Sequence, residues 1–165
     1  MKVVIADTSP LNYLILIGEV ELLPHLFGEI LVPDVVASEL GDPEAPRLVR
    51  SWASYPPSWL GIRPTPASSE LLERLDEGER AAILLAEAQE APVLLLIDDA
   101  EGRAEADRRR IPATGTLGVL RAAATRNMVD LATALDRLRS TNFRAPALLI
   151  EQLLAEDRQR KGPRM

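Results

Sequence analysis

The stretch that decides the fold is "VVIADTSPLNYLIL", residues 3–16, in which a short apolar run ends at the carboxylate Asp7. Its first four residues are typical of a strand that is buried on both faces of a parallel sheet. Ser9 and Pro10 then predict the N-cap and the first residue of a helix that continues to about Gly18. Because burying an ionised carboxylate is costly unless a helix start, a basic group or a metal ion compensates for it, Asp7 is a candidate functional residue.

Three further apolar runs extend this pattern along the chain. "VLLLI" at 93–97 is as continuous as the first run, "EILVP" at 29–33 is weaker, and "IPATGT" at 111–116 is a fourth candidate strand. Composition and spacing predict helices over residues 10–18, 33–40, 78–90, 100–110, 116–127, 130–140 and 146–160. Strands that alternate with helices indicate an α/β fold with a mainly parallel sheet.

The composition favours one globular domain and excludes several kinds of catalytic site. The chain has 165 residues, of which 47% are apolar, enough for a hydrophobic core. Because cysteine is absent from the sequence, disulfides, thiolate zinc sites and cysteine nucleophiles are excluded. The single histidine, His25, argues against a histidine-based metal site or a Ser-His triad. We expect residues 156–165 to form a frayed tail.

Charge is distributed unevenly along the chain. Residues 1–99 carry 6 basic and 17 acidic side chains, a balance of -11, whereas residues 100–165 carry 13 basic and 8 acidic ones, a balance of +5. This asymmetry predicts an acidic site in the first part and a surface for an anion or an acidic partner in the second. Apolar runs fall short of the roughly 18 residues that span a membrane. Because the segment before "VVIA" is too short for a signal peptide, we expect a cytoplasmic location.

Residues 42–66 differ from the rest of the chain in composition. They hold six of the thirteen prolines and both tryptophans, Trp52 and Trp59. One interpretation is a connecting segment with a short helix around 46–54 and with the tryptophans packed onto the domain. The other is an element at the rim of the site or in a dimer interface, because exposed aromatic residues suit interfaces.

Acidic side chains occur where a parallel α/β sheet binds its ligands, beyond the carboxyl ends of the strands. Asp7 ends the first strand, and Asp98 and Asp99 directly follow the strong strand in the middle of the chain. Glu39 lies near the end of a short helix and Glu79 in the first turn of the next one, and each borders the apolar side of its helix. Taken singly, each glutamate has an ordinary interpretation as a solvated or capping residue.

Together, these carboxylates indicate a metal site. Several carboxylates that face one cleft repel each other, and a divalent cation relieves that repulsion. Ligation by oxygen alone, without Cys or His, suits Mg²⁺ or Mn²⁺ rather than zinc. Such an ion acidifies water and offsets charge on a phosphoryl group, which is the chemistry of phosphodiester hydrolysis.

Four segments, "ADTSPL", "LVPDVVASEL", "LDEGERAAILLA" and "LLLIDDAEGRAEADRRRIPATGTLGVL", resemble in order and spacing the motifs of a PIN domain. The similarity is to a compact prokaryotic branch that contains VapC-like toxins of type II toxin–antitoxin pairs. It implies a three-layer PIN-like α/β fold, a central mainly parallel sheet flanked by helices, as one nuclease domain over residues 1–155. It also implies an Mg²⁺- or Mn²⁺-dependent endoribonuclease with an RNA substrate, a cognate antitoxin, and a homodimer formed through residues 10–17 and 46–60.

The resemblance assigns the catalytic and metal-binding roles to five acids. Asp7 matches the aspartate that follows the first strand, Glu39 matches the glutamate of a "VxxEL" helix, and Glu79 matches the third acid of this branch. The fourth acid is Asp98 or Asp99. The doublet leaves this open, although Asp98 is favoured because it follows the strand directly.

Five further residues are accessory candidates by the same resemblance. Thr8 or Ser9 matches a small hydroxyl residue that helps to hold metal or water beside the first aspartate. Thr114 and Thr116 flank the glycine of "TGT" near the same strand ends. Arg103 matches the arginine of "IDDxxxR", which either contacts substrate phosphate and restrains the acids or forms a surface ion pair.

Two other functions compete with the ribonuclease. A catalytically weak PIN-like module would bind RNA or a protein partner without cutting, and "DRRRIP" at 107–112 either follows an RNA backbone or is a solvated helix end. A receiver-type signalling domain would need an acidic pair after the first strand and a lysine after the last strand. This chain has a lone Asp7 there, and its two lysines, Lys2 and Lys161, lie near the termini, which argues against a receiver.

Overall fold

The computed structural model describes residues 2–68, 72 and 74–162. Contacts between residues divide the chain into two compact units, Met1–Thr116 and Leu117–Met165. The first unit contains the five-stranded sheet and every acid singled out above. The second unit is helical.

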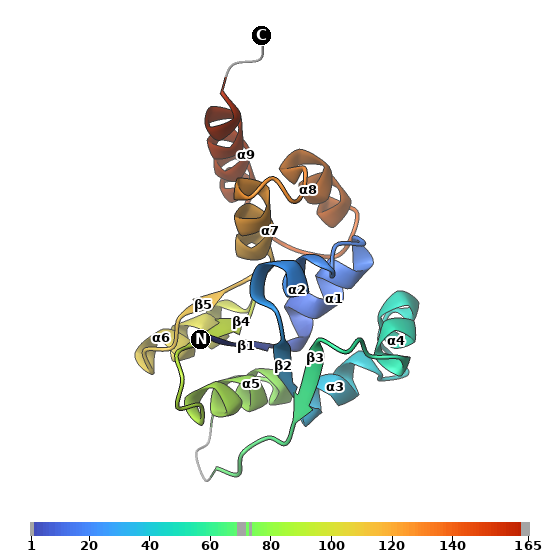
Figure 1. Cartoon of the computed structure of the whole chain (residues 1–165), viewed down its shortest axis with the longest axis vertical. Coiled ribbons are helices and arrows are strands. Elements are labelled where there is room, and N and C mark those ends of the chain that lie inside the picture. Colours follow the sequence, from blue (N-terminus) through green and yellow to red (C-terminus); the bar gives the residue numbers. More distant parts are fainter. Residues whose placement is uncertain (1, 69–71, 73, 163–165) are drawn as a thin grey trace. The chain divides into compact units, whose positions relative to one another are not determined.

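The sheet consists of five short strands: β1 (Val3–Ala6), β2 (Ile30–Pro33), β3 (Leu60–Arg63), β4 (Val93–Leu96) and β5 (Ala113–Thr114). They pair in the order β3-β2-β1-β4-β5, and every pair is parallel (Figure 1). In register, Ile5 of β1 lies between Leu31 of β2 and Leu95 of β4. The predicted α/β fold with a central parallel sheet is confirmed.

Helices of the first unit flank the sheet: α1 (Thr8–Leu16), α2 (Leu22–Phe27), α3 (Asp34–Leu40), α4 (Arg47–Ser54), α5 (Glu77–Glu87) and α6 (Ala100–Arg108). Figure 1 shows α5 on one side of the sheet and α1 and α2 on the other. A parallel sheet needs both faces covered, because its strands are apolar on both sides.

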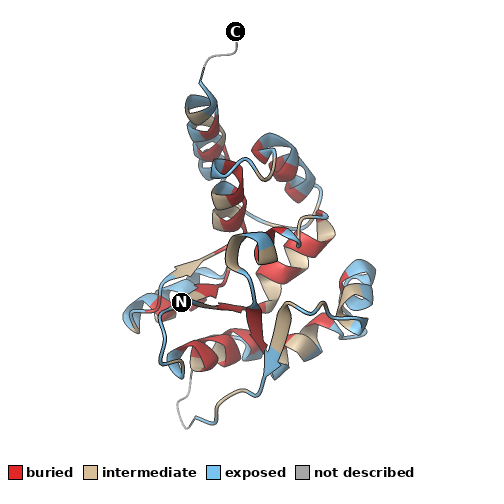
Figure 2. Ribbon diagram, in the orientation of Figure 1, coloured by how far each residue is buried: buried red, intermediate tan, exposed pale blue. Residues whose placement is uncertain are grey.

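The core lies on both faces of the central strands. Ile5 and Leu95 pack with Ile83 of α5 in one buried cluster. The neighbouring positions Val4 and Leu96, whose side chains point to the opposite face, are 2% and 0% exposed. In Figure 2 the central part of the sheet has the colour of buried residues. The continuous apolar runs in the sequence therefore reflect burial on both sides.

Helix α1 begins two residues earlier than predicted. Its N-cap is Asp7 rather than Ser9, with an extended backbone at φ -79° and ψ 172°, and Thr8 is the first helical residue. Pro10 is consequently the third helical residue. Its missing N–H is tolerated there because amides of the first turn have no partner within the helix.

Two elements formed where the sequence predicted none. Strand β3 lies within residues 42–66, and it is held by parallel pairing with β2. The tryptophans of this segment, Trp52 and Trp59, pack on each other with ring centroids 5.8 Å apart.

Helix α2 forms across "LLPHLF", where His25 is exposed and its Nδ1 lies 2.7 Å from the Glu21 carbonyl oxygen. His25 therefore has a local structural contact, as its isolation in the sequence suggested.

The strand order places the acids at one point of the sheet. From β1 the chain continues to β2 and β3 on one side, whereas β4 and β5 lie on the other. Open α/β sheets bind their ligands outside the carboxyl ends of the strands at such a reversal. Asp7 directly follows β1, and only Ile97 separates Asp98 from the end of β4.

The second unit contains α7 (Thr116–Thr125), which starts at the last residue of the first unit, α8 (Leu131–Arg139) and α9 (Ala147–Lys161). Residues 156–161, expected to be frayed, belong to α9 because Asp157 is only 4% exposed and pairs with Arg160 and Lys161. Residues 163–165 of the expected tail lie outside the described residues. Across the described ranges, the helices are too short or too polar to cross a membrane.

The central strand should dominate stability. We expect Ile5→Ala to lower the free energy of unfolding by about 2–5 kcal/mol, because it opens a cavity at a fully buried site. Urea denaturation followed by circular dichroism measures this change. Leu48→Ala, at a side chain that is 61% exposed, is the matched control, and equal losses in both variants would contradict the assignment of the core.

Candidate active site

Asp7 is a buried carboxylate with an unsatisfied oxygen. The residue is 4% exposed, and its Oδ1 atom has no hydrogen-bond partner within the described part of the chain. Burial is the main reason that the pKa of Asp7 rises to about 7, although the backbone amide of Thr8 opposes the rise. The neighbouring carboxylates of Asp76, Glu39 and Asp98 raise the same pKa further. Burying an oxygen atom without a hydrogen-bond donor costs free energy. A cation bound to the Asp7 Oδ1 would offset this cost.

Asp98 is fixed by the residue that begins α7. Its Oδ1 accepts a hydrogen bond from the Thr116 amide at 2.6 Å, and its Oδ2 accepts one from the Thr116 hydroxyl at 2.8 Å. Thr116 is fully buried. A Cβ atom on the adjacent Gly115 would lie 2.5 Å from the Asp98 Oδ1, so this glycine makes room for the carboxylate.

Asp99 has a different partner from its neighbour. It is the N-cap of α6, and its Oδ2 accepts a hydrogen bond from the Gly102 amide at 3.0 Å. Its charge raises the pKa of Glu79, whereas the charge of Asp98 raises that of Asp7. Both members of the doublet thus act on acids of the site, and the choice between them as the fourth acid stays open.

Glu39 connects the start of α1 with the start of α5. Its Oε2 accepts a hydrogen bond from the Thr8 hydroxyl at 2.5 Å, and its carboxylate also accepts one from the Gly78 amide. A Cβ atom on Gly78 would lie 2.6 Å from the Glu39 Oε1, so the carboxylate lies directly against the backbone of α5. Burial raises the pKa of Glu39, and the charge of Asp76 adds to this effect.

Asp76 is an acid of this group that the sequence analysis did not single out. It is the N-cap of α5, and its Oδ1 accepts a hydrogen bond from the Glu79 amide at 2.8 Å. Burial raises the pKa of Glu79 to about 8, and a hydrogen bond between the two carboxyl groups contributes to the rise. The signal was present as "DEGE", an acidic cap followed three residues later by glutamate.

The accessory candidates divide into two groups. Thr8 and Thr116 bond to site carboxylates, whereas Ser9 and Thr114 make no side-chain hydrogen bond among the described residues. Arg103 is exposed and borders Asp98: the Cβ position of Gly115 lies 3.6 Å from its guanidinium and 2.5 Å from the Asp98 Oδ1.

The acids of this group offer the oxygen donors that a hard cation prefers, but their side chains are not arranged around one point. Neighbouring acids of the group raise the pKa of Asp7, Glu39 and Glu79, and all the donor atoms of the group are oxygens. Within the described ranges, no three Asp, Glu or His side chains are arranged so that they hold one ion. The unpartnered Oδ1 of Asp7 is the observation that indicates a cation. The assignment of the five acids as its ligands stays a prediction.

Glycine at 115 should be required for the position of Asp98. We expect Gly115→Ala to lower the free energy of unfolding by about 1–3 kcal/mol, since the new methyl group overlaps the carboxylate. Urea denaturation measures the loss, and the Thr116 amide resonance should shift as its bond to Asp98 breaks. Gly41→Ala is the control, because its nearest atoms would lie 3.8 Å away. Equal stability of the two variants would contradict this packing.

The raised pKa values predict a pH dependence of stability in the presence of EDTA. Asp7 and Glu79 keep their protons in the folded protein up to about pH 7 and 8, whereas their ordinary values are 3.8 and 4.5. Between these limits the folded state binds more protons than the unfolded state, so the free energy of unfolding falls as the pH rises from 5 to 8. Each pKa unit corresponds to about 1.4 kcal/mol, so the fall should reach a few kcal/mol.

Variants identify the groups responsible for this slope. Asp7→Asn keeps the shape and cannot ionise, so urea denaturation at pH 5, 6, 7 and 8 should show a flatter profile. Asp136→Asn, at an exposed carboxylate of α8, should retain the wild-type profile. If the two profiles have the same slope, the ionisation of Asp7 does not change the free energy of unfolding, which would contradict the prediction.

A protein-family model described as a PIN domain matches residues 3–159, which include all six acids. No curated protein and no solved structure matches the chain. PIN domains are generally nucleases and generally use divalent metal ions. On the extent of this match, and with a parallel sheet that carries the acids at its strand-order reversal, the chain belongs to the PIN-domain family.

Proposed function

We propose that this protein is a metal-dependent ribonuclease that hydrolyses phosphodiester bonds of RNA. The observation that carries the proposal is the buried, unsatisfied Oδ1 of Asp7 at the carboxyl end of the central strand. An ionised carboxylate in this position destabilises the fold unless a cation or a donor compensates for it, because burial and the neighbouring carboxylates raise its pKa to about 7. Because its neighbours are also carboxylates, a divalent cation would compensate more negative charge here than a single basic side chain would.

The residues that would hold the ion are Asp7 after β1, Glu39 of α3, Glu79 of α5, and Asp98 or Asp99 between β4 and α6. When bound, Mg²⁺ or Mn²⁺ acidifies water and offsets the negative charge that develops on a phosphoryl group. Asp76 acts on this set through Glu79, since it bonds both the amide and the carboxyl group of that residue.

The other side chains of the site hold the acids in place and receive the substrate. The Thr8 hydroxyl orients Glu39, and Thr116 holds both oxygens of Asp98. Arg103 is exposed beside Asp98, where a guanidinium can pair with a phosphate of the strand that is cut. These contacts make the edge of the sheet rigid before the substrate arrives, which favours catalysis.

The biological setting of the proposal comes from the family resemblance. Resemblance to the prokaryotic branch supports a toxin of a type II toxin–antitoxin pair that acts in the cytoplasm as a homodimer. Co-purification with the product of an adjacent gene and light scattering of the purified protein test these two statements.

A binding module without cleavage is the second candidate. It is favoured by one observation, that no three acids of the described residues are arranged to hold an ion. In that case the protein would bind RNA or a protein partner, and its carboxylates would bind a cation weakly.

Cleavage of a mixed RNA pool distinguishes the two candidates. We expect cutting with Mg²⁺ or Mn²⁺, none with EDTA, and a loss of at least about 100-fold in Asp7→Asn, because one essential charge disappears while the shape is kept. Asp136→Asn is the matched control and should cut like wild type. Equal traces of cutting in wild type and Asp7→Asn would indicate contamination and would favour the binding module.

A further inference from the structure

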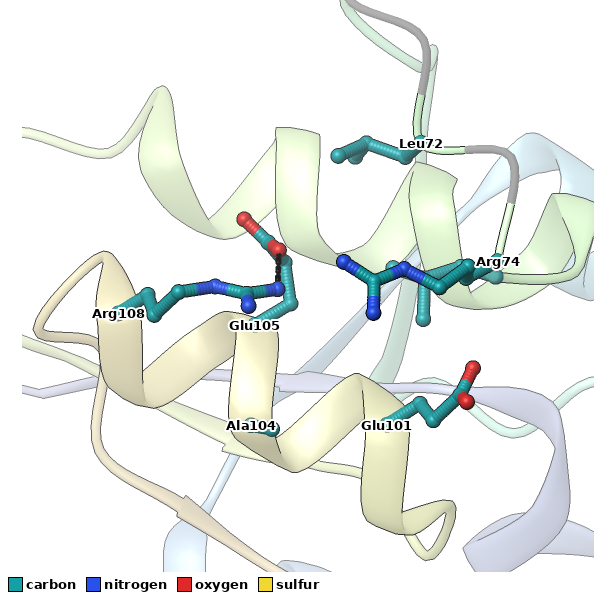
Figure 3. A pocket seen from close by; sticks show the side chains of 7 residues that line it. Leu72, Arg74, Glu101, Ala104, Glu105 and Arg108 are labelled. Carbon is teal, nitrogen blue, oxygen red and sulfur yellow. Dashed lines mark hydrogen bonds and ion pairs between the residues drawn. The ribbon is translucent and has the colours of Figure 1, made fainter.

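A pocket of about 410 Å³ lies between the segment that precedes α5 and the exposed face of α6. Its lining consists of Leu72, Arg74, Leu75, Glu101, Ala104, Glu105 and Arg108. Figure 3 shows the Arg74 guanidinium reaching over the pocket between the Arg108–Glu105 ion pair and the Glu101 carboxylate. The volume is within the range of roughly 300–1,000 Å³ that is typical of small-ligand sites.

The pocket offers one cationic and one anionic group for a ligand. Glu105 is already occupied, because it pairs with Arg108 and Arg109, which lower its pKa. The side chains of Arg74 and Glu101, in contrast, make no hydrogen bond or ion pair within the described part of the chain. The wall between these charges is apolar and includes Leu75, which is 7% exposed.

Both walls of the pocket continue along the chain into residues of the acidic site. Leu75 directly precedes Asp76, and Glu101 follows Asp99 by two residues at the start of α6. The ligand that we consider for this pocket is therefore a nucleotide next to a phosphate held at the acids. All these residues belong to the first compact unit.

We propose that this pocket binds a guanine base of the RNA substrate, next to the phosphate that is cut. Guanine presents two donors on its Watson–Crick edge, which suit the Glu101 carboxylate, and two acceptors, O6 and N7, which suit the Arg74 guanidinium. Leu75 and Ala104 provide the apolar surface for the ring. The inference rests on the proposed ribonuclease function and names the nucleotide that this site prefers.

The charge of the pocket argues against a phosphate as its occupant. Among the described residues that line it, two arginines and two glutamates balance in formal charge, whereas a site for a dianion would have excess positive charge. Uracil presents mainly carbonyl acceptors and a single N–H, and adenine has no carbonyl beside N7. Both bases leave one of the two charged groups with a poorer partner than guanine does.

Binding of mononucleotides tests the pocket without cleavage. The four ribonucleoside 5′-monophosphates are titrated into ¹⁵N-labelled full-length protein in EDTA, and amide shifts are recorded with inorganic phosphate as a further probe. We expect GMP to shift the amides of Leu75, Glu101 and Ala104 and to bind at least fivefold more tightly than AMP, CMP or UMP. Equal affinity for all four, or the same shifts with phosphate alone, would overturn the proposal.

Matched variants assign the effect to the two charged groups. Glu101→Gln and Arg74→Gln should each weaken GMP binding at least tenfold and reduce the preference over AMP. Glu90→Gln and Arg47→Gln, at exposed positions outside the pocket, should bind GMP like wild type. GMP affinity that is unchanged in both pocket variants would overturn the proposal.

A filled pocket separates this inference from the ribonuclease itself. Ala104 is an exposed helical residue, so Ala104→Trp should keep the fold, as checked by thermal unfolding, while its ring occupies the space for the base. We expect it to abolish GMP binding and, where the wild type cuts RNA, to remove a preference for sites beside guanine. If no RNA is cut with any metal while GMP binds selectively, the ribonuclease fails and the base site stands. Cutting of RNA without guanine preference in the wild type would overturn the base site alone.

Discussion

The burial of one carboxylate is the constraint on which the acidic edge of this protein depends. Asp7 ends the central strand, and one of its oxygens is buried without a donor in the described structure. Removing a charge from water in this way costs several kcal/mol unless something compensates for it. This cost arises where open α/β sheets bind their ligands, because the strand order reverses at β1.

Backbone amides near helix N-termini compensate for the remaining negative charge. Thr116 donates to Asp98 at the start of α7, Gly102 donates to Asp99 at the start of α6, and Gly78 donates to Glu39 at the start of α5. Free amides and the positive end of the helix dipole stabilise an anion at each of these places. Among the described residues, Thr8 is the one whose amide lowers the pKa of Asp7, and the Asp7 Oδ1 accepts no hydrogen bond.

The sequence predicted those features that depend on local pattern. The strands at 3–6 and 93–96 were recognisable because both of their faces are apolar, and Asp7 and Asp98 were recognisable because they follow those strands. Strand β3 was not recognisable, because "LGIR" is short, partly exposed and surrounded by prolines, and it exists through pairing with β2. Asp76 was missed for a related reason: a capping residue belongs to its own helix in the sequence, and only the fold brings it next to other acids.

Close packing against the backbone explains why small residues accompany the acids in the sequence. Glu39 reaches the amide of α5 only because Gly78 has no side chain, and a Cβ atom there would lie 2.6 Å from its oxygen. Gly102 likewise allows α6 to approach Ile97, since a Cβ atom would lie 2.5 Å from the Ile97 Cδ1. Glu39, Asp98 and Asp99 are held by main-chain amides, whose positions are fixed by the helices that begin there. Such an arrangement would suit the proposed metal-dependent nuclease, because main-chain donors keep carboxylates that repel each other in place and leave free oxygen lone pairs for a cation.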